Sequence, residues 1–254
     1  MDELDEARTW IASARRVVVL TGAGISTDSG LPDFRGPQGI WTKDPAAEKA
    51  SHISHYLSDP EVRVRAWRNR LENRGWTAEP NAGHRAVVEL ERTGRLHTLI
   101  TQNVDGLHHA AGSDPARVIE VHGTVRDYAC LACGDRGPLQ DALDRVRAGE
   151  ADPPCRRCGG ILKSATISFG QSLVAEDLQR ATNAARECDL LLAVGSTLSV
   201  FPIADVVPLA VAHGAPVVIV NGSPTAMDDL ADAVLNGSIS DLLPELVADL
   251  AAVD

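Results

Sequence analysis

The chain has 254 residues, and 24 Lys+Arg against 35 Asp+Glu give it a formal net charge of −11. This acidic balance argues against a nucleic-acid binder that relies on positive charge over the whole molecule. Hydrophobic residues make up 44% of the chain and charged residues 23%, a globular composition that excludes intrinsic disorder, while aromatic residues make up only 4%, so aliphatic side chains must build the core.

The predicted elements alternate between helices and short aliphatic strands. The first is an amphipathic helix over residues 2–14, which has apolar residues at helical spacing. Aliphatic runs typical of buried strands follow at residues 17–20, 96–100, 118–121, 190–194 and 216–220. Helical patterns flank these runs at residues 82–91, 176–187, 203–212 and 241–252. The alternation predicts an α/β fold with an open, mostly parallel sheet.

Two stretches interrupt this alternation and predict a smaller lobe. Residues 45–80 lack a strand pattern and contain an arginine-rich helical segment, residues 61–70, which we interpret as a solvated helix face. Residues 126–165 hold both CxxC pairs. We therefore expect a main domain made of residues 1–44, 81–125 and 166–254, with a helical insertion at 45–80 and a metal-binding module at 126–165.

Four of the five cysteines form two CxxC pairs, with 21 residues between the pairs: Cys130, Cys133, Cys155 and Cys158. A two-residue gap lets both thiolates of a pair face one ion, and two such pairs complete a tetrahedron. Because four thiolates leave no open coordination position, we expect one structural zinc ion. A redox dithiol and an iron site are the alternatives. The fifth cysteine, Cys188, lies in a helical pattern and is predicted to be buried packing.

A glycine turn follows the first predicted strand and contains Gly22, Ala23, Gly24, Ile25 and Ser26. Backbone N–H groups in this setting can hold a phosphate, although Thr27 replaces the third glycine of the dinucleotide fingerprint. Two further polar turns follow predicted strands: Gly195, Ser196 and Thr197, and Asn221, Gly222 and Ser223. Ligands of open parallel sheets bind beyond the carboxyl ends of strands, so the three turns together predict a dinucleotide site. The alternative is that they are ordinary strand-to-helix turns.

The loop over residues 28–36 is polar and rich in glycine, yet it carries one apolar side chain, Phe34, between Asp33 and Arg35. A mobile lid over a cofactor has this composition, and so does an ordinary surface loop.

Polar side chains also follow two other predicted strands. The strand at 96–100 leads into Gln102, Asn103, Val104 and Asp105, which places an amide and a carboxylate at the edge of the sheet. The strand at 118–121 ends at His122, whose position suits a general base near neutral pH. The other histidines, among them His84, His108 and His109, are predicted to be structural or exposed to solvent.

The order of these motifs resembles the sirtuin family, the NAD-dependent protein-lysine deacylases. The motifs are GAGIS (22–26), PDFRG (32–36), TQNVD (101–105), HGT (122–124), the paired CxxC motifs, FG (169–170), GSTLSV (195–200) and NGS (221–223). The resemblance extends from about residue 16 to residue 244. It implies a Rossmann-like NAD-binding domain and a small lobe made of a zinc module and a helical insertion.

The resemblance also implies a mechanism. In sirtuins the amide oxygen of an acyl-lysine attacks C1′ of the nicotinamide ribose, which expels nicotinamide and forms an alkylimidate. The final products are free lysine and O-acyl-ADP-ribose. By this resemblance the catalytic residues are His122, as general base, with Asn103 and Asp105 at the nicotinamide pocket. The remaining NAD contacts it implies are Gly22, Ala23, Gly24, Ile25, Ser26, Asp33, Phe34, Arg35, Gln102, Val104, Gly195, Ser196, Thr197, Asn221, Gly222, Ser223 and Ile239. An acyl-lysine peptide is expected to bind as an extended strand between residues 169–173 and 199–201.

The resemblance leaves the acyl group open. Sirtuins that remove succinyl groups carry Tyr-x-x-Arg where this chain has Trp67 and Arg70, which argues against a succinyl preference. Val104 and Gln171 place the chain nearer the mitochondrial-type class II branch. We expect a deacetylase; the alternatives are a mono-ADP-ribosyltransferase, a lipoamidase-type deacylase and, from another class, a nonenzymatic sensor of NAD or ADP-ribose.

The expected location is the cytoplasm. The first eight residues are acidic and lack the basic start of a secretory signal, and paired CxxC motifs suit a reducing compartment. No apolar run approaches the roughly 18 residues of a membrane span. We expect no membrane and no nucleic-acid partner, and the sequence leaves the oligomeric state undetermined.

Overall fold

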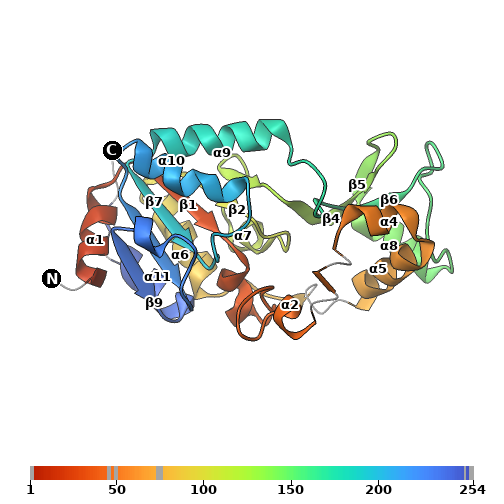
Figure 1. The fold of residues 1–254 in the computed structure, drawn as a ribbon, viewed down its shortest axis with the longest axis horizontal. Helices are drawn as coiled ribbons and strands as arrows, with labels where there is room; N and C mark the ends of the chain where they lie inside the picture. Colours follow the sequence, from red (N-terminus) through yellow and green to blue (C-terminus); the bar gives the residue numbers. More distant parts are fainter. Residues whose placement is uncertain (1–2, 45–46, 49–50, 73–76, 249, 252–254) are drawn as a thin grey trace.

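The computed structural model describes residues 3–44, 47–48, 51–72, 77–248 and 250–251. Within these residues the chain forms a large lobe around a six-stranded parallel sheet and a small lobe around a three-stranded antiparallel sheet (Figure 1). The predicted fold class, a mostly parallel α/β sheet with a smaller lobe, is confirmed. The predicted limits at residues 1, 2, 45, 252 and 254 lie outside the described residues.

The large sheet has the strand order β3-β2-β1-β7-β8-β9. Its strands are β1 (Val17–Thr21), β2 (Leu96–Thr101), β3 (Val118–Glu120), β7 (Leu190–Val194), β8 (Val217–Asn221) and β9 (Ala233–Asn236). The last residue of β1, Thr21, pairs with Thr101 of β2 and with Val194 of β7. The carboxyl ends of the three strands therefore meet at one edge of the sheet. From β1 the chain adds β2 and β3 on one side and β7, β8 and β9 on the other, so this edge is a topological switch point.

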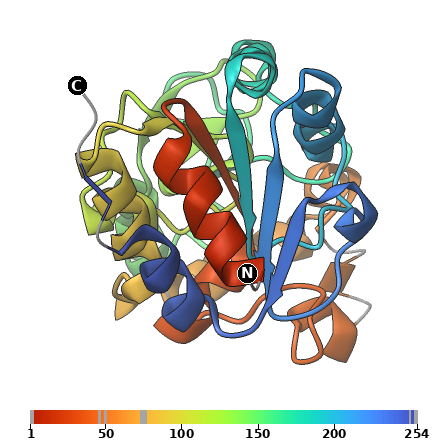
Figure 2. The same cartoon turned by 90° about the vertical axis from the view of Figure 1, so that its left-hand side faces the viewer.

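Both faces of this sheet are apolar because alternate residues of a buried strand point to opposite faces. Val17 and Val19 pack in one core cluster with α1, α6 and α11, and Val18 and Leu20 pack in a second cluster with α9 and α10 (Figure 2). Fully burying such a side chain stabilises the fold by roughly 1.5–3 kcal/mol. The helices of this lobe are α1 (Glu3–Ser13), α6 (Ala82–Arg92), α7 (Leu107–Ala111), α9 (Ala175–Glu187), α10 (Val206–Ala212) and α11 (Ile239–Val247), with the 3₁₀ helices η1 (Ala23–Ser29), η3 (Ile203–Asp205) and η4 (Asp228–Leu230).

The small lobe joins the two predicted insertions. Its sheet has the order β5-β4-β6, made of β4 (Gly123–Cys130), β5 (Arg136–Pro138) and β6 (Leu162–Thr166). The helices beside it are α4 (Ile53–Ser58), α5 (Pro60–Glu72) and α8 (Leu139–Arg147), and the short α2 (Ile40–Lys43) precedes them in the chain. Trp67 of α5, 1% exposed, packs with Leu139 and Leu143 of α8 and Leu162 of β6, so residues from both insertions share one core.

Three features of the fold differ from the sequence predictions. A sixth parallel strand, β9, was not predicted, because its four residues are only partly apolar and alternate in burial. The residues around His108, which lie outside every predicted helix, form the short helix α7. The last predicted helix begins at Ile239, two residues early, and ends at Val247.

The prediction of a solvated face on residues 61–70 is wrong for two arginines. The Arg63 Nε donates to Asp152 at 2.7 Å, and its side chain is only 11% exposed. The Arg70 Nη2 donates to the Ser164 hydroxyl at 2.9 Å, and burial lowers the pKa of Arg70. Both contacts join α5 to segments of the other insertion, which a periodicity within one helix does not reveal.

In the described part of the chain, we find no helix with both the length and the apolar character needed to cross a membrane.

Candidate active site

One large cavity lies at the carboxyl ends of β1, β2, β7 and β8 and extends between the two lobes. Its volume is about 1890 Å³, ample for a dinucleotide together with a peptide segment. Every residue predicted to contact NAD lines it except Ile25, and His122 lines it as well. Ile25 is 1% exposed and packs in the core beneath the glycine turn, so its side chain lies away from the cavity.

The glycine turn after β1 and the turn after β7 are in direct contact. The Gly22 N–H donates to the Val194 carbonyl at 3.0 Å, and the Gly24 N–H donates to the Gly195 carbonyl at 2.8 Å. A Cβ on Gly24 would lie 2.7 Å from the Gly195 Cα, and Gly195 has a φ of +64°. Glycine is therefore required here by close backbone approach and by a left-handed conformation.

The loop that follows η1 forms one wall of the cavity. The Phe34 and Trp41 rings have centroids 4.6 Å apart, and the Arg35 guanidinium lies 4.5 Å from the Trp41 centroid. Arg35 also pairs with Glu48 at 3.0 Å, and Asp33 accepts a hydrogen bond from the Gly36 N–H. Trp41 lies outside every motif predicted from the sequence.

His122 is held in one tautomer. Its Nδ1 lies 3.0 Å from the Gln102 carbonyl, which can only accept, so Nδ1 carries the hydrogen and Nε2 is left as the basic nitrogen. Burial lowers the pKa of His122, and the hydrogen bond to the Gln102 carbonyl opposes that shift. The imidazole is therefore mostly neutral near pH 7, the state in which it can accept a proton.

The loop after β2 brings the predicted amide and carboxylate together with Ser26. The Ser26 hydroxyl donates to Asp105 Oδ2 at 2.8 Å, and the Asn103 Nδ2 donates to the Gly22 carbonyl at 3.0 Å and to Ser26 Oγ at 3.2 Å. The Gln102 Nε2 donates to the Ser196 hydroxyl at 2.9 Å. These bonds join the strand ends of β1, β2 and β7 around one part of the cavity.

The turn after β8 lies next to the turn after β7, since the Gly195 N–H donates to the Val220 carbonyl at 2.9 Å. The Asn221 Nδ2 donates to the Ser223 carbonyl at 2.7 Å, which shapes the turn, and a Cβ on Gly222 would meet nothing closer than 3.9 Å. Ile239, at the start of α11, lines the same part of the cavity and is 6% exposed.

The two segments predicted to hold a peptide both line the cavity. Phe169 is 37% exposed and its ring centroid lies 5.4 Å from that of Trp41, while Phe201 is 61% exposed. Exposed aromatic side chains beside a cavity are a common feature of surfaces that bind peptides.

The small lobe adds Lys163 to the cavity wall near Arg70, and no predicted motif includes this lysine. Lys163 is 5% exposed, and its Nζ donates to the Thr166 hydroxyl at 3.1 Å. Burial and the nearby Arg70 lower the pKa of Lys163 to about 7. The sequence signal for Lys163 is a lysine in an otherwise uncharged strand.

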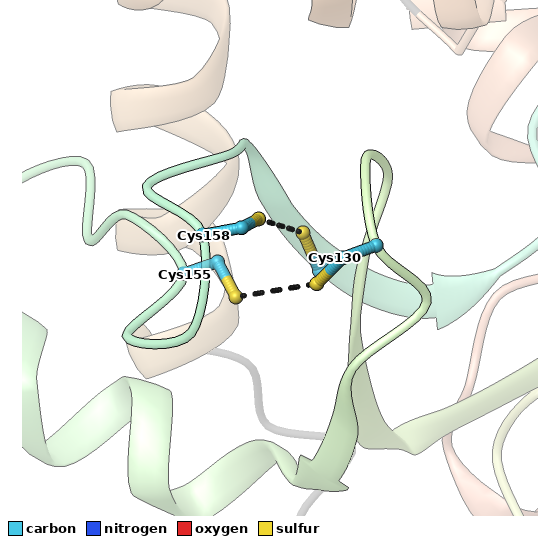
Figure 3. Close-up of side chains that lie close together, drawn as sticks. Cys130, Cys155 and Cys158 are labelled. Atoms are coloured by element: carbon cyan, nitrogen blue, oxygen red, sulfur yellow. Dashed lines mark hydrogen bonds between the residues drawn. The ribbon is translucent and has the colours of Figure 1, made fainter.

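The four cysteines of the CxxC pairs form one cluster in the small lobe (Figure 3). Their sulfurs lie within 4.8 Å of one another, and the Cys130–Cys158 and Cys133–Cys155 pairs are 3.5 Å and 3.8 Å apart. Zinc–sulfur bonds of about 2.3 Å at a tetrahedral angle place sulfurs about 3.8 Å apart, so the cluster fits zinc.

The neighbouring groups shift the pKa values of two of these thiols in opposite directions. Backbone N–H groups of Cys133 and Ala132 help to lower the pKa of Cys130 to about 6. The Gly160 N–H lowers the pKa of Cys158, but its neighbouring thiols outweigh this and raise that pKa to about 12. Four sulfurs at this spacing hold all their negative charge only when a metal ion balances it. Cys188, outside the cluster, is buried as predicted.

Comparison with known proteins identifies the family of this chain. The profile of the Sir2 family matches residues 22–202. The NAD-dependent protein deacetylase 2 of Streptomyces coelicolor is 50% identical over 234 residues, which cover 92% of this chain and 97% of that protein. A solved structure that concerns the mechanism and regulation of Sir2 enzymes is 38% identical, with a TM-score of 0.88 and 98% of both chains covered. A Sir2 structure with a deacetylated p53 peptide and 3′-O-acetyl-ADP-ribose is 33% identical, with a TM-score of 0.87 and 96% of both chains covered. The chain therefore belongs to the Sir2 family.

Proposed function

We propose that this protein is an NAD-dependent protein-lysine deacetylase that forms nicotinamide, free lysine and O-acetyl-ADP-ribose. The observation that carries this proposal is the single cavity in which His122, the loop after β2 and the glycine turns face one another. Relatives with this activity in their names cover almost the whole chain. NAD supplies the ribose carbon that accepts the acyl oxygen. The residues of this chain bind NAD and the peptide, orient them, and take a proton from a ribose hydroxyl.

In this proposal His122 is the general base. Its Nδ1–H is fixed on the Gln102 carbonyl, so Nε2 can take a proton from a ribose hydroxyl without rotation of the ring. A base held in one tautomer and kept neutral by burial typically contributes 10²- to 10⁴-fold to the rate.

The nicotinamide end of NAD lies against Asn103 and Asp105. An amide and a carboxylate can pair with the two ends of a carboxamide, and Ser26 holds both side chains in place. The helix η1 begins within the first glycine turn, so backbone N–H groups at its start can face the phosphates. Glycine is needed at positions 22 and 24 because a Cβ there would collide with the opposite turn. Asn221, Gly222 and Ile239 then line the adenosine side.

The substrate is an acyl-lysine peptide that binds as an added strand between residues 169–173 and 199–201. Both segments line the cavity, and one named Sir2 structure with the same fold holds a deacetylated peptide. The net charge of −11 would favour lysine-rich protein segments over acidic ones.

The zinc ion is structural in this proposal. Its four ligands would be Cys130, Cys133, Cys155 and Cys158, and none of them lines the cavity. The ion would join the turn between β4 and β5 to the turn before β6, and so stabilise the small lobe.

Three finer assignments complete the proposal. The main domain comprises residues 1–44, 81–125 and 166–254, although β4 and β6 cross the limits near residues 125 and 165. Val104 and Gln171 support a place near the mitochondrial-type branch. Four metal-binding thiols support a cytoplasmic, reducing location.

The test incubates the protein with NAD and acetyl-, succinyl-, lipoyl- and long-acyl-lysine peptides, and follows peptide mass and nicotinamide release together. Loss of acetyl groups with equal release of nicotinamide supports the proposal. A gain of ADP-ribose by a protein, with no peptide losing its acyl group, would replace it with ADP-ribosyl transfer. Binding of NAD with no turnover of any peptide would instead support a nonenzymatic sensor of NAD or ADP-ribose.

A further inference from the structure

Two buried histidines lie behind the cavity wall and have no part in the reaction proposed above. His84 of α6 and His108 of α7 are 0% and 2% exposed, and their ring centroids are 4.9 Å apart in an edge contact. Burial lowers the pKa of His84 to about 4 and that of His108 to about 3, so both rings are neutral near pH 7. A buried neutral imidazole still has one donor and one acceptor to satisfy.

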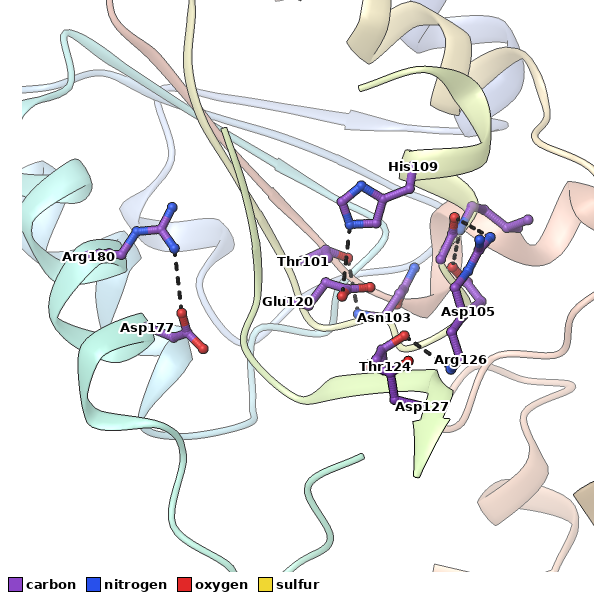
Figure 4. Close-up of polar contacts among 12 residues, drawn as sticks. Thr101, Asn103, Asp105, His109, Glu120, Thr124, Arg126, Asp127, Asp177 and Arg180 are labelled. Atoms are coloured by element: carbon purple, nitrogen blue, oxygen red, sulfur yellow. Dashed lines mark hydrogen bonds and ion pairs between the residues drawn. The ribbon is translucent and has the colours of Figure 1, made fainter. Parts of the chain in front are cut away.

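His108 begins a chain of hydrogen bonds that ends at the backbone of Asn103. The Thr21 hydroxyl donates its single hydrogen to the Thr101 hydroxyl at 2.9 Å. The 3.0 Å contact between His108 Nε2 and Thr21 Oγ1 therefore requires Nε2–H to be the donor. The Thr101 hydroxyl then accepts from the Asn103 N–H at 3.1 Å (Figure 4). The chain fixes the tautomer of His108 and ties the ring to the loop after β2.

The second nitrogen of His108 indicates that the role of the ring is to supply the Nε2–H donor to Thr21. Nδ1 is buried and has no hydrogen-bond partner among the described residues. An apolar side chain would fill the same space without leaving a buried polar atom unsatisfied. The imidazole thus carries an energetic penalty at Nδ1 while it supplies one donor at Nε2.

His84 supports the side chains of the same loop. Its Nε2 lies 3.4 Å from the Ser26 hydroxyl, the group that donates to Asp105 and accepts from the Asn103 Nδ2. One imidazole therefore supports the backbone of the loop, and the other contacts the serine that holds its side chains.

We propose that His108 is a positioning residue for the deacetylase reaction: its Nε2–H, through Thr21 and Thr101, holds the Asn103 backbone so that Asn103 and Asp105 face nicotinamide. This inference rests on the proposed function, because it takes this loop to be the nicotinamide site. His108 does not line the cavity, so its loss loosens the loop without removing a contact to substrate. NAD and free nicotinamide should then bind more weakly, while acyl-peptide binding stays unchanged.

The decisive variant is Thr21→Val, which removes the middle hydroxyl of the chain and keeps the branched shape. The loss of one buried hydrogen bond corresponds to about tenfold in an equilibrium constant. We expect the KM for NAD and the half-inhibiting nicotinamide concentration each to rise about tenfold, with the KM for acetyl-lysine peptide within about twofold of wild type. Thr21→Ser keeps the hydroxyl and should restore wild-type values.

Thr98→Val is the matched control. Thr98 is another buried threonine of the same sheet, 8% exposed, and its hydroxyl contacts His97 rather than the site. His108→Leu removes the donor itself and should reproduce the effect of Thr21→Val. Because both changes break one chain, the double variant should lose no more than either single variant.

The proposal is overturned if Thr21→Val lowers the melting temperature as Thr98→Val does but leaves the NAD and nicotinamide values unchanged, since the role is then structural only. Additive losses in the double variant also overturn it. If Thr21→Val does not fold, the comparison is made at His108 instead. His108→Leu removes the donor and should weaken binding of NAD and nicotinamide, whereas His108→Gln retains an N–H donor and should weaken it less. Calorimetric titration with NAD and nicotinamide needs no turnover. A wild-type protein that does not deacetylate peptides would refute the proposed function, but the effect of Thr21→Val on the binding of NAD and nicotinamide could still be measured.

Discussion

The contact between the turns after β1 and β7 can be tested by one methyl group at Gly195. In Gly195→Ala the new Cβ would lie 2.3 Å from the Ile25 backbone nitrogen and 2.8 Å from the Gly24 carbonyl carbon. Atoms of two backbones cannot move aside as a side chain can, so the turns must separate. That separation displaces the backbone N–H groups that we assign to the phosphates of NAD.

The magnitude follows from two contributions. A residue with a side chain at a φ of +64° loses about 1–2 kcal/mol, and forcing a methyl group into a packed contact costs about 1–3 kcal/mol more. Gly214→Ala separates the two contributions, because Gly214 has a φ of +82° and no neighbouring group of the described residues lies within 4 Å of its Cβ position. We expect Gly214→Ala to lose about 1–2 kcal/mol of unfolding free energy, and Gly195→Ala about 2–5 kcal/mol.

The assay combines urea unfolding with the KM for NAD. Gly195→Ala should raise the KM for NAD at least about tenfold, which is about 1.4 kcal/mol of lost binding, while Gly214→Ala leaves it unchanged. Equal losses of unfolding free energy in the two variants, with equal KM values, would show that the contact between the turns is neither tight nor important for NAD.

Three further outcomes are expected. His122→Ala should lower kcat by about 10²- to 10⁴-fold with the melting temperature unchanged, and near wild-type turnover would remove His122 as the base. Because a base acts unprotonated and burial lowers the pKa of His122, kcat should stay high as pH falls to about 6.5 and decline only below it; a midpoint above pH 7 would contradict this. Cys155→Ala should release the bound zinc and lower the melting temperature, whereas Cys188→Ala should keep one zinc per chain by elemental analysis, and a fully metal-loaded Cys155→Ala would contradict the four-cysteine site.

Much of the large lobe could be read from the amino-acid sequence. The strands β1, β7 and β8 are almost entirely aliphatic, because a parallel strand covered by helices on both faces needs apolar side chains in both directions. The strand β2 follows the same pattern less strictly, since it contains His97 and Thr98. The turns that follow them are marked by Gly22, Gly24 and Gly195, since close backbone approach excludes a Cβ there. Paired CxxC motifs indicate a metal by spacing alone.

The amino-acid sequence alone thus predicts the family, the main sheet, the four-cysteine cluster and the turns at the strand ends that line the cavity. The folded chain was needed to show that Ile25 packs inward, that Arg63 and Arg70 are covered by the other insertion, and that Trp41 and Lys163 line the cavity. It was also needed to show that His84 and His108 meet behind the cavity wall. The physical reason is that local periodicity and motif spacing describe one segment at a time, whereas burial, tautomer and hydrogen-bond partners depend on segments that only the folded chain brings together.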